Sequence, residues 1–152
     1  MAGPRQALPE SGKQLIFRGR IIQFALMGSV LIYGLVVRLL HLEGEPTVGD
    51  PEGIQMIFSI LGIGSCFVAY LANRFLLKPE RLGGTSDADR LNGRVFVSFI
   101  ITWAIAETCA VFGLVLSMLL KNPELYTTFG MLAFLTILAH PITEGRLRAL
   151  MT

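Results

Sequence analysis

The sequence predicts an all-α protein, a bundle of four transmembrane helices, and three observations lead to this prediction. Hydrophobic residues make up 53% of the 152 residues, and charged residues only 16%. The mean hydropathy is +0.61, which is typical of integral membrane proteins. Long apolar runs recur along the chain, and about 20 such residues are enough to cross the hydrocarbon layer of a bilayer as a helix. Because backbone in lipid must satisfy its own hydrogen bonds, these runs indicate helices rather than an open sheet.

The membrane domain is expected to cover residues 14–148 and to follow a cytoplasmic tail formed by residues 1–13. Its helices are expected over about residues 15–42, 52–77, 92–120 and 124–142. The basic residues before the first apolar run could mimic a secretory signal peptide. That run is longer than a signal-peptide core and no small-residue cleavage site follows it, so we expect a retained helix. The second helix follows an acidic, turn-rich loop, where Asp50 is the expected N-cap and Pro51 the first helical residue.

The distribution of basic residues predicts the orientation in the membrane. Of the 13 Lys and Arg residues, only Arg38 and Lys121 fall on the side of the loop that joins the first two helices. Loops that stay in the cytoplasm carry the excess of Lys and Arg. We therefore expect a multi-pass protein of the cell inner membrane, with both termini and residues 78–94 in the cytoplasm and residues 43–52 outside.

Small or polar residues form one stripe on each of the second and third helices, at spacings of three and four residues. The two stripes consist of Ser59, Gly62, Cys66, Ala69 and Asn73, and of Thr102, Ala106, Ala110, Gly113 and Ser117. Ser98 is expected to lie off the second stripe. Small residues let membrane helices approach closely. The stripes therefore predict that these two helices pack as an antiparallel hairpin.

Glu107 is the main functional clue, because it is the only formally charged residue between Arg94 and Lys121. An ionisable group at mid-membrane costs at least about 2.5–3.5 kcal/mol on insertion scales, so it usually faces protein or water and has a function. Removal from water disfavours a charged carboxylate, so we expect Glu107 to be mainly protonated unless a cation is bound. Counting residues from the cytoplasmic ends of the helices places Ser65 and Cys66 level with Glu107. Ser65 is therefore a predicted member of the site.

The residues around Glu107 also carry a resemblance. Residues 104–108 (Ala-Ile-Ala-Glu-Thr) and 112–115 (Phe-Gly-Leu-Val) resemble the ion-binding helix of the proteolipid c subunit of rotary ATP synthases. In that family an Ala-x-Ala-Glu step places the ion-carrying Glu, and a (Tyr/Phe)-Gly-Leu-Val step follows. The resemblance implies that Glu107 holds H⁺ or Na⁺, and that Thr108 is the neighbouring hydroxyl found in Na⁺-type members.

The resemblance is local. Residues 61–64 (Leu-Gly-Ile-Gly) are similar to the glycine repeat in the first helix of the c-subunit hairpin, but the repeat has only two members here. The Arg-Gln-Pro turn of the family is absent from the middle loop, and Phe112 stands where the family has a hydroxyl. Residues 33–37 (Tyr-Gly-Leu-Val-Val) also read like residues 112–116, which leaves open whether the chain consists of two duplicated helical hairpins or shows a chance similarity.

The sequence lacks the motifs of several classes of enzyme and cofactor chemistry. No Ser/His/Asp grouping, paired carboxylates, P-loop or dinucleotide fingerprint is present. Cys66 and Cys109 are expected to be small packing residues, and His41 and His140 are expected near opposite membrane faces, where they cannot share a metal. We therefore expect neither an enzyme nor a cofactor. The formal net charge of +2 is too small to indicate nucleic acid.

Two functions remain open. The first is reversible binding or translocation of H⁺ or Na⁺ at Glu107, as in rotary proteolipids, within a homo-oligomer or a larger membrane complex. The alternative is a structural or assembly subunit of a membrane complex, in which Glu107 is a buried polar contact between helices. The lipid bilayer is an expected partner in both.

Overall fold

The computed structural model describes residues 10–40, 44–78 and 88–145, and these residues form an all-helical protein. Within these ranges the helices are α1 (Glu10–Leu39), α2 (Pro51–Leu76), α4 (Ala88–Leu120) and α5 (Pro123–Ala139), with no strand. The prediction of an all-α chain with four helices is thus confirmed. In the described part of the chain α1, α2 and residues 91–120 of α4 are long and apolar enough to cross a membrane, whereas α5 is shorter. This indicates a multi-pass membrane protein.

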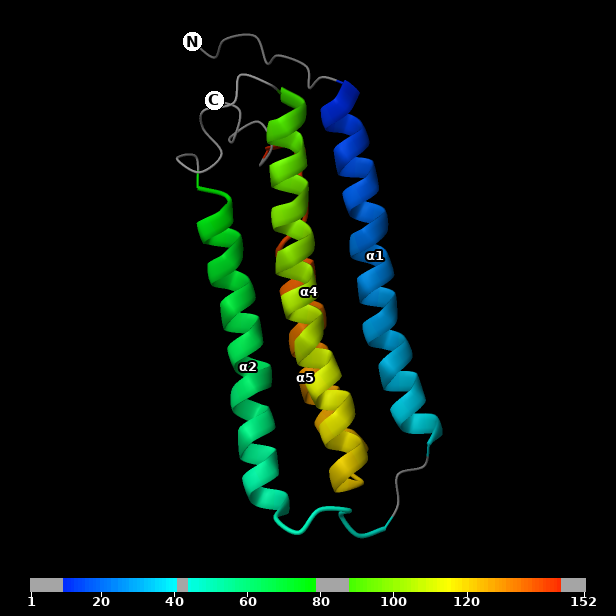
Figure 1. Ribbon diagram of the computed structural model, residues 1–152. Helices are drawn as coiled ribbons and strands as arrows, with labels where there is room; N and C mark the ends of the chain where they lie inside the picture. The colour runs from blue at the N-terminus through cyan, green and yellow to red at the C-terminus, as the bar shows by residue number, and fades with distance from the viewer. Residues whose placement is uncertain (1–9, 41–43, 79–87, 146–152) are drawn as a thin grey trace.

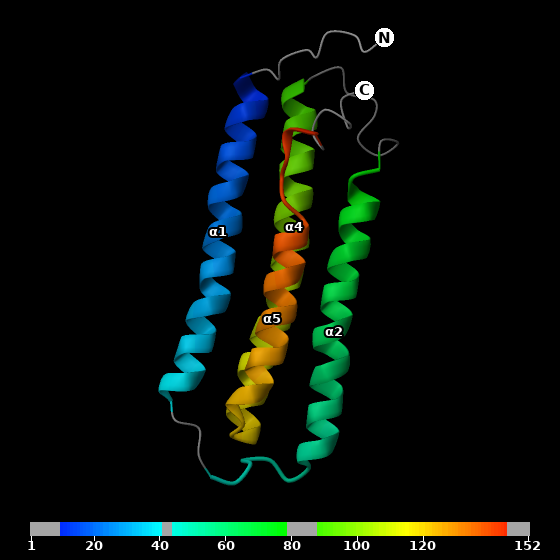
Figure 2. The same ribbon diagram turned by 180° about the vertical axis from the view of Figure 1, so that it is seen from behind.

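The helices are arranged around a central pair. Figures 1 and 2 show α4 and α5 one in front of the other, with α1 on one side of this pair and α2 on the other. Consequently α1 and α2 do not form a hairpin of their own. The loop between them passes the end of α4, where both the backbone N–H and the hydroxyl of Thr47 donate to the carbonyl of Leu119, at 2.9 and 3.0 Å.

The starts of two helices follow directly from their sequences. Asp50 caps α2 by accepting a hydrogen bond of 3.0 Å from the Gly53 N–H, and Pro51 is the first helical residue, as predicted. In the same way Asn122 accepts a 3.0 Å bond from the Glu124 N–H ahead of α5. The tight connection from α4 uses Lys121 in the left-handed conformation, with φ of 54°. By contrast, α1 begins already at Glu10, inside the segment expected to be a tail.

Apart from the partly exposed Ser59, the small-residue stripes on α2 and α4 are buried, and the two helices pack against each other antiparallel, as predicted. The space that their glycines leave is filled by a third helix. A Cβ atom added at Gly62 of α2 or at Gly113 of α4 would overlap the side chain of Phe129 of α5. The stripes therefore make room for an aromatic ring between the helices. Ser98 was wrongly expected to lie off the stripe: it is buried, and its hydroxyl donates to the Arg94 carbonyl at 2.8 Å.

The C-terminal end of α5 lies inside the bundle, beside the middle of α4 (Figure 2). The indole N–H of Trp103 donates to the carbonyl of His140 at 3.0 Å, and the amide of Gln23 donates to the carbonyl of Ile137 at 2.9 Å. Trp103, Gln23 and His140 are all buried. Backbone carbonyls at the end of a helix need partners when water is absent, and here side chains of α4 and α1 supply them. This explains how α5 can stop short of the bundle end.

Candidate functional site: a carboxylate between two helices

Glu107 lies in the middle of α4, and its half-buried side chain is directed toward α1. The hydroxyl of Ser29 forms a hydrogen bond with Oε1 of Glu107, and the phenol of Tyr33 donates to the same oxygen at 3.2 Å. Ser29 and Tyr33 are four residues apart in α1, so they lie on one face of that helix, one turn apart. The site therefore consists of one carboxylate from α4 and two hydroxyl groups from α1.

Position along the bundle brings these groups together. The helices α1 and α4 run in the same direction (Figure 1). Ser29 and Glu107 lie equally far from the first residues of their helices, Glu10 and Ala88. Since both helices rise by about 1.5 Å per residue, side chains at equal distances from the start are at the same depth.

The hydroxyl of Ser29 has a second partner, which determines what the site can do. Its oxygen lies 2.7 Å from the carbonyl oxygen of Leu26 in the same helix. A hydroxyl has one hydrogen to donate and two lone pairs to accept with. With Glu107 charged, Ser29 donates to the carboxylate. With Glu107 protonated, the carboxyl donates to Ser29, and Ser29 donates to Leu26. The same heavy-atom arrangement thus satisfies both protonation states.

The hydroxyl groups predicted from the sequence form their hydrogen bonds elsewhere. Ser65 is buried and donates to the carbonyl of Gly62 at 2.7 Å, and Thr108 lies on an exposed face of α4 and donates to the carbonyl of Ala104 at 3.0 Å. Because α2 and α1 flank α4 on opposite sides, a residue of α2 can be level with Glu107 and still face the other side of the helix. An ion-binding role for Ser65 or Thr108 stays a prediction.

Comparison of the chain with models of protein families, with curated proteins and with solved structures found no match. The resemblance to rotary proteolipids therefore rests on the short sequence similarities described above and remains a hypothesis.

The ligand set of the site limits its chemistry. In the described ranges no group of three or more His, Cys, Asp or Glu side chains could hold a metal ion. Glu107, Ser29 and Tyr33 offer oxygen atoms only, with one carboxyl group that can change its charge. Such a set can hold a proton, or a monovalent cation in its place.

Sequence reasoning missed Ser29 and Tyr33, although a signal for them exists. The depth count that selected Ser65 on the second helix selects Tyr33 when it is applied to the first helix, twelve residues on from Ile21. Ser29 then follows from helical periodicity, because it is one turn from Tyr33. What the sequence does not supply is the side of α4 on which each neighbouring helix lies.

Proposed function

We propose that the chain is a multi-pass inner-membrane protein that binds and releases H⁺ at Glu107. The observation that carries this proposal is the pair of hydroxyl groups on one carboxylate oxygen, of which Ser29 can donate or accept. A site that moves a proton must keep its hydrogen bonds satisfied in both states, since an unsatisfied buried polar group costs about 1–3 kcal/mol. Ser29 meets this requirement by rotation of a single O–H bond.

The location of Glu107 supports exchange of the proton with a partner. Its side chain is half-buried at the edge of the contact between α1 and α4, and the neighbouring Ala104 and Thr108 are exposed. A carboxylate bordering lipid cannot stay charged at low cost, so release of the proton requires water or a partner group at this face. This requirement fits a subunit of a homo-oligomer or of a larger membrane complex.

We also propose a membrane topology with four spans. α5 is the fourth span together with the extended residues that follow it, and both termini lie in the cytoplasm. The start of α1, the end of α2 and the start of α4 lie at one end of the bundle (Figure 1). Among the described side chains, the basic residues of that end are Lys13, Arg18, Arg20, Arg74, Lys78 and Arg94. A concentration of positive charge at one end is typical of the cytoplasmic side.

We propose H⁺ rather than Na⁺ because both hydroxyl groups bond directly to the carboxylate. A bound Na⁺ would need the oxygens arranged around the ion, and the structure places them in hydrogen-bonding contact with Oε1 of Glu107. Protection by Na⁺ in the experiment below separates the two ions.

A structural role is the second candidate, and the same bonds favour it. Ser29 and Tyr33 tie α1 to α4, while Gln23 and Tyr126 tie α1 to α5. On this view Glu107 is a permanently protonated contact that specifies how α1 packs, and no ion moves.

Labelling with a hydrophobic carbodiimide tests the proposal, because the reagent reacts with protonated carboxyl groups in apolar surroundings. We expect labelling at Glu107 near neutral pH that declines as the pH rises, and no labelling in Glu107→Gln. We also expect Glu107→Gln to fold and to assemble like the wild type, since the amide keeps the shape and the hydrogen bonds. Labelling that does not change between acidic and alkaline pH would refute reversible protonation and leave the structural role. Protection by Na⁺ at constant pH would show that the ion is Na⁺.

A further inference from the structure

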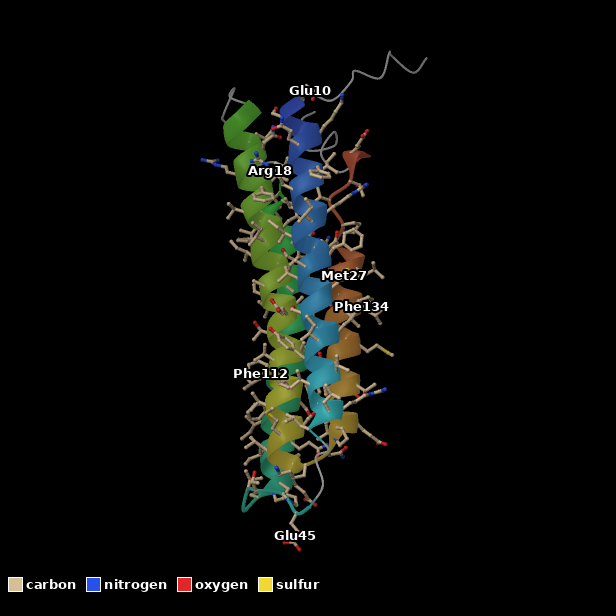
Figure 3. All side chains as sticks on the ribbon, turned by 90° about the vertical axis from the view of Figure 1, so that its right-hand side faces the viewer. Glu10, Arg18, Met27, Glu45, Phe112 and Phe134 are labelled. Atoms are coloured by element: carbon tan, nitrogen blue, oxygen red, sulfur yellow. The ribbon has the colours of Figure 1, made fainter. Side chains whose placement is uncertain are left out.

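A second flank of α1 faces α5. Viewed from the α1 side, α4 and α5 lie to the two sides of this helix (Figure 3). Between α1 and α5 there is an open groove of about 440 Å³. It lies on the opposite flank from the one that carries Ser29 and Tyr33, so it is separate from the Glu107 site.

The floor of this groove, the α1–α5 groove, is built around Tyr126. Its phenol donates a hydrogen bond to the carbonyl of Val30, and its ring covers Gly34 of α1 and Gly130 of α5. A Cβ atom at Gly34 would lie 2.9 Å from the ring, and one at Gly130 would lie 2.8 Å from it. Because the two glycines have no side chains, the ring of Tyr126 can lie close to both helix backbones, and this leaves the space of the groove open.

The walls of the groove are apolar and lie at the depth of the hydrocarbon layer. Leu31 and Leu35 of α1 are 64% and 56% exposed, and Met131 of α5 is 60% exposed. Phe134 completes the α5 wall (Figure 3). Apart from Thr127 the side chains of these walls are apolar, so hydrocarbon is the natural filling.

One end of the groove carries a cation. Arg38, in the last turn of α1, lines the groove beside Pro123, the first residue of α5. Arg38 is exposed, and among the described residues the structure shows no ion pair for it. Because Arg38 is at the end of its helix, its guanidinium can reach the depth at which lipid headgroups lie.

We propose that the α1–α5 groove binds one phospholipid with an anionic headgroup. An acyl chain lies along the apolar walls, and Arg38 binds the headgroup phosphate, for which a guanidinium supplies two parallel N–H donors. The volume is within the range of about 300–1,000 Å³ found for small-molecule sites.

Native mass spectrometry of the delipidated protein in detergent tests this proposal, with phosphatidylglycerol and the zwitterionic phosphatidylcholine as probes. We expect one bound phosphatidylglycerol and weaker binding of phosphatidylcholine. Arg38→Gln should weaken phosphatidylglycerol binding about tenfold, since it removes a charge-assisted contact. Thr127→Trp should weaken both lipids, because the exposed Thr127 lines the groove and an indole ring would fill it.

Matched controls separate the groove from general effects of charge and bulk. Arg20→Gln removes the same charge from the other end of α1, and Thr128→Trp adds the same bulk to an exposed neighbour that does not line the groove. Both should bind lipid like the wild type, and all four variants should unfold at the wild-type temperature without lipid. Equal binding of the two lipids, binding unaffected by Arg38→Gln and Thr127→Trp, or no bound lipid would overturn the proposal. So would an oligomer that Thr127→Trp dissociates without any change in lipid binding, because the occupant would then be a second copy of the chain.

Discussion

At the scale of single residues, the hydroxyl of Ser29 can hydrogen-bond to Glu107 in either protonation state of the carboxyl group. It contacts Oε1 of Glu107 and the carbonyl oxygen of Leu26 at once, and it has one hydrogen for the two. The carbonyl of Leu26 already belongs to the hydrogen-bond ladder of α1, so it loses little when the hydroxyl turns away. Under the proposed function, Ser29 would accept from a protonated Glu107 and donate to a charged one, whereas Tyr33, at 3.2 Å, would donate in both states.

Removal of these hydroxyl groups should change the yield of carbodiimide labelling at Glu107. Both hydroxyl groups contact the carboxyl oxygen Oε1, so the loss of either leaves this oxygen more accessible to the reagent. In Ser29→Ala we expect the yield of labelling at a fixed neutral pH to increase about fivefold, and in Tyr33→Phe by less. Thr108→Ala is the control, because its hydroxyl bonds to the carbonyl of Ala104. A change in Thr108→Ala with none in Ser29→Ala would favour the site predicted from the sequence instead.

The sequence alone identified the acid but not its partners. Glu107 stands out because no other formal charge lies between Arg94 and Lys121. Its partners depend on which helix lies on which side of α4, and hydropathy and residue spacing do not contain this information. Ser65 was chosen on the assumption that the second helix faces the acid, whereas the hydrogen bonds to Glu107 come from α1.

At the scale of helices, aromatic side chains of α5 fill the spaces that small residues leave on the other helices. Phe129 fills the space at Gly62 and Gly113, and Tyr126 fills the space at Gly34. The start of α2 and the α2–α4 contact could be predicted, because a cap, a proline and small-residue periodicity are local signals. The role of α5 could not, because a stripe of small residues does not reveal whether backbone or a ring occupies the space beside it.

Two glycines of α2 offer a matched test of this packing. An added Cβ at Gly62 would overlap the ring of Phe129, whereas one at Gly64 would meet nothing within 4 Å. We expect Gly62→Ala to destabilise the protein in detergent by about 1–3 kcal/mol, the usual cost of overpacking. Gly64→Ala should be neutral or stabilising by up to about 1 kcal/mol, because Ala is the better helix former.

Thermal unfolding measures both effects, and a second substitution checks their cause. Phe129→Leu should recover part of the stability lost in Gly62→Ala, since it removes the ring that the new methyl group meets. Equal melting temperatures for Gly62→Ala and Gly64→Ala would show that the ring does not occupy this space.

At the scale of the whole molecule, α1 connects two features on its opposite flanks. One flank carries the hydroxyl groups that bind Glu107, and the other forms the α1–α5 groove with Arg38 at its end. Both depend on α1 staying against the central pair of helices. The hydrogen bonds from Gln23 to α5 and from Tyr126 of α5 to α1 help to hold it there.

The proposed orientation predicts which ends of the helices a membrane-impermeant thiol reagent can reach. Gly49 and Lys13 are both exposed, at opposite ends of the bundle, and a side chain at Gly49 would meet nothing within 4 Å. In intact cells we expect Gly49→Cys to be labelled from outside and Lys13→Cys only after the cells are opened. The native Cys66 and Cys109 are buried and provide the background signal. If only Lys13→Cys were labelled in intact cells, the proposed orientation would be wrong.

Infrared difference spectroscopy of the protein in lipid bilayers tests reversible protonation of Glu107 most directly, because the carbonyl stretch of a protonated carboxyl group is resolved from that of a carboxylate. We expect a carboxyl band that is present at acidic and neutral pH, weakens as the pH rises, returns when the pH is lowered, and is missing in Glu107→Gln. The band should also change frequency in Ser29→Ala, which removes one of its hydrogen-bond partners. A band assigned to Glu107 that keeps the same intensity over the whole pH range in which the protein stays folded would contradict the account.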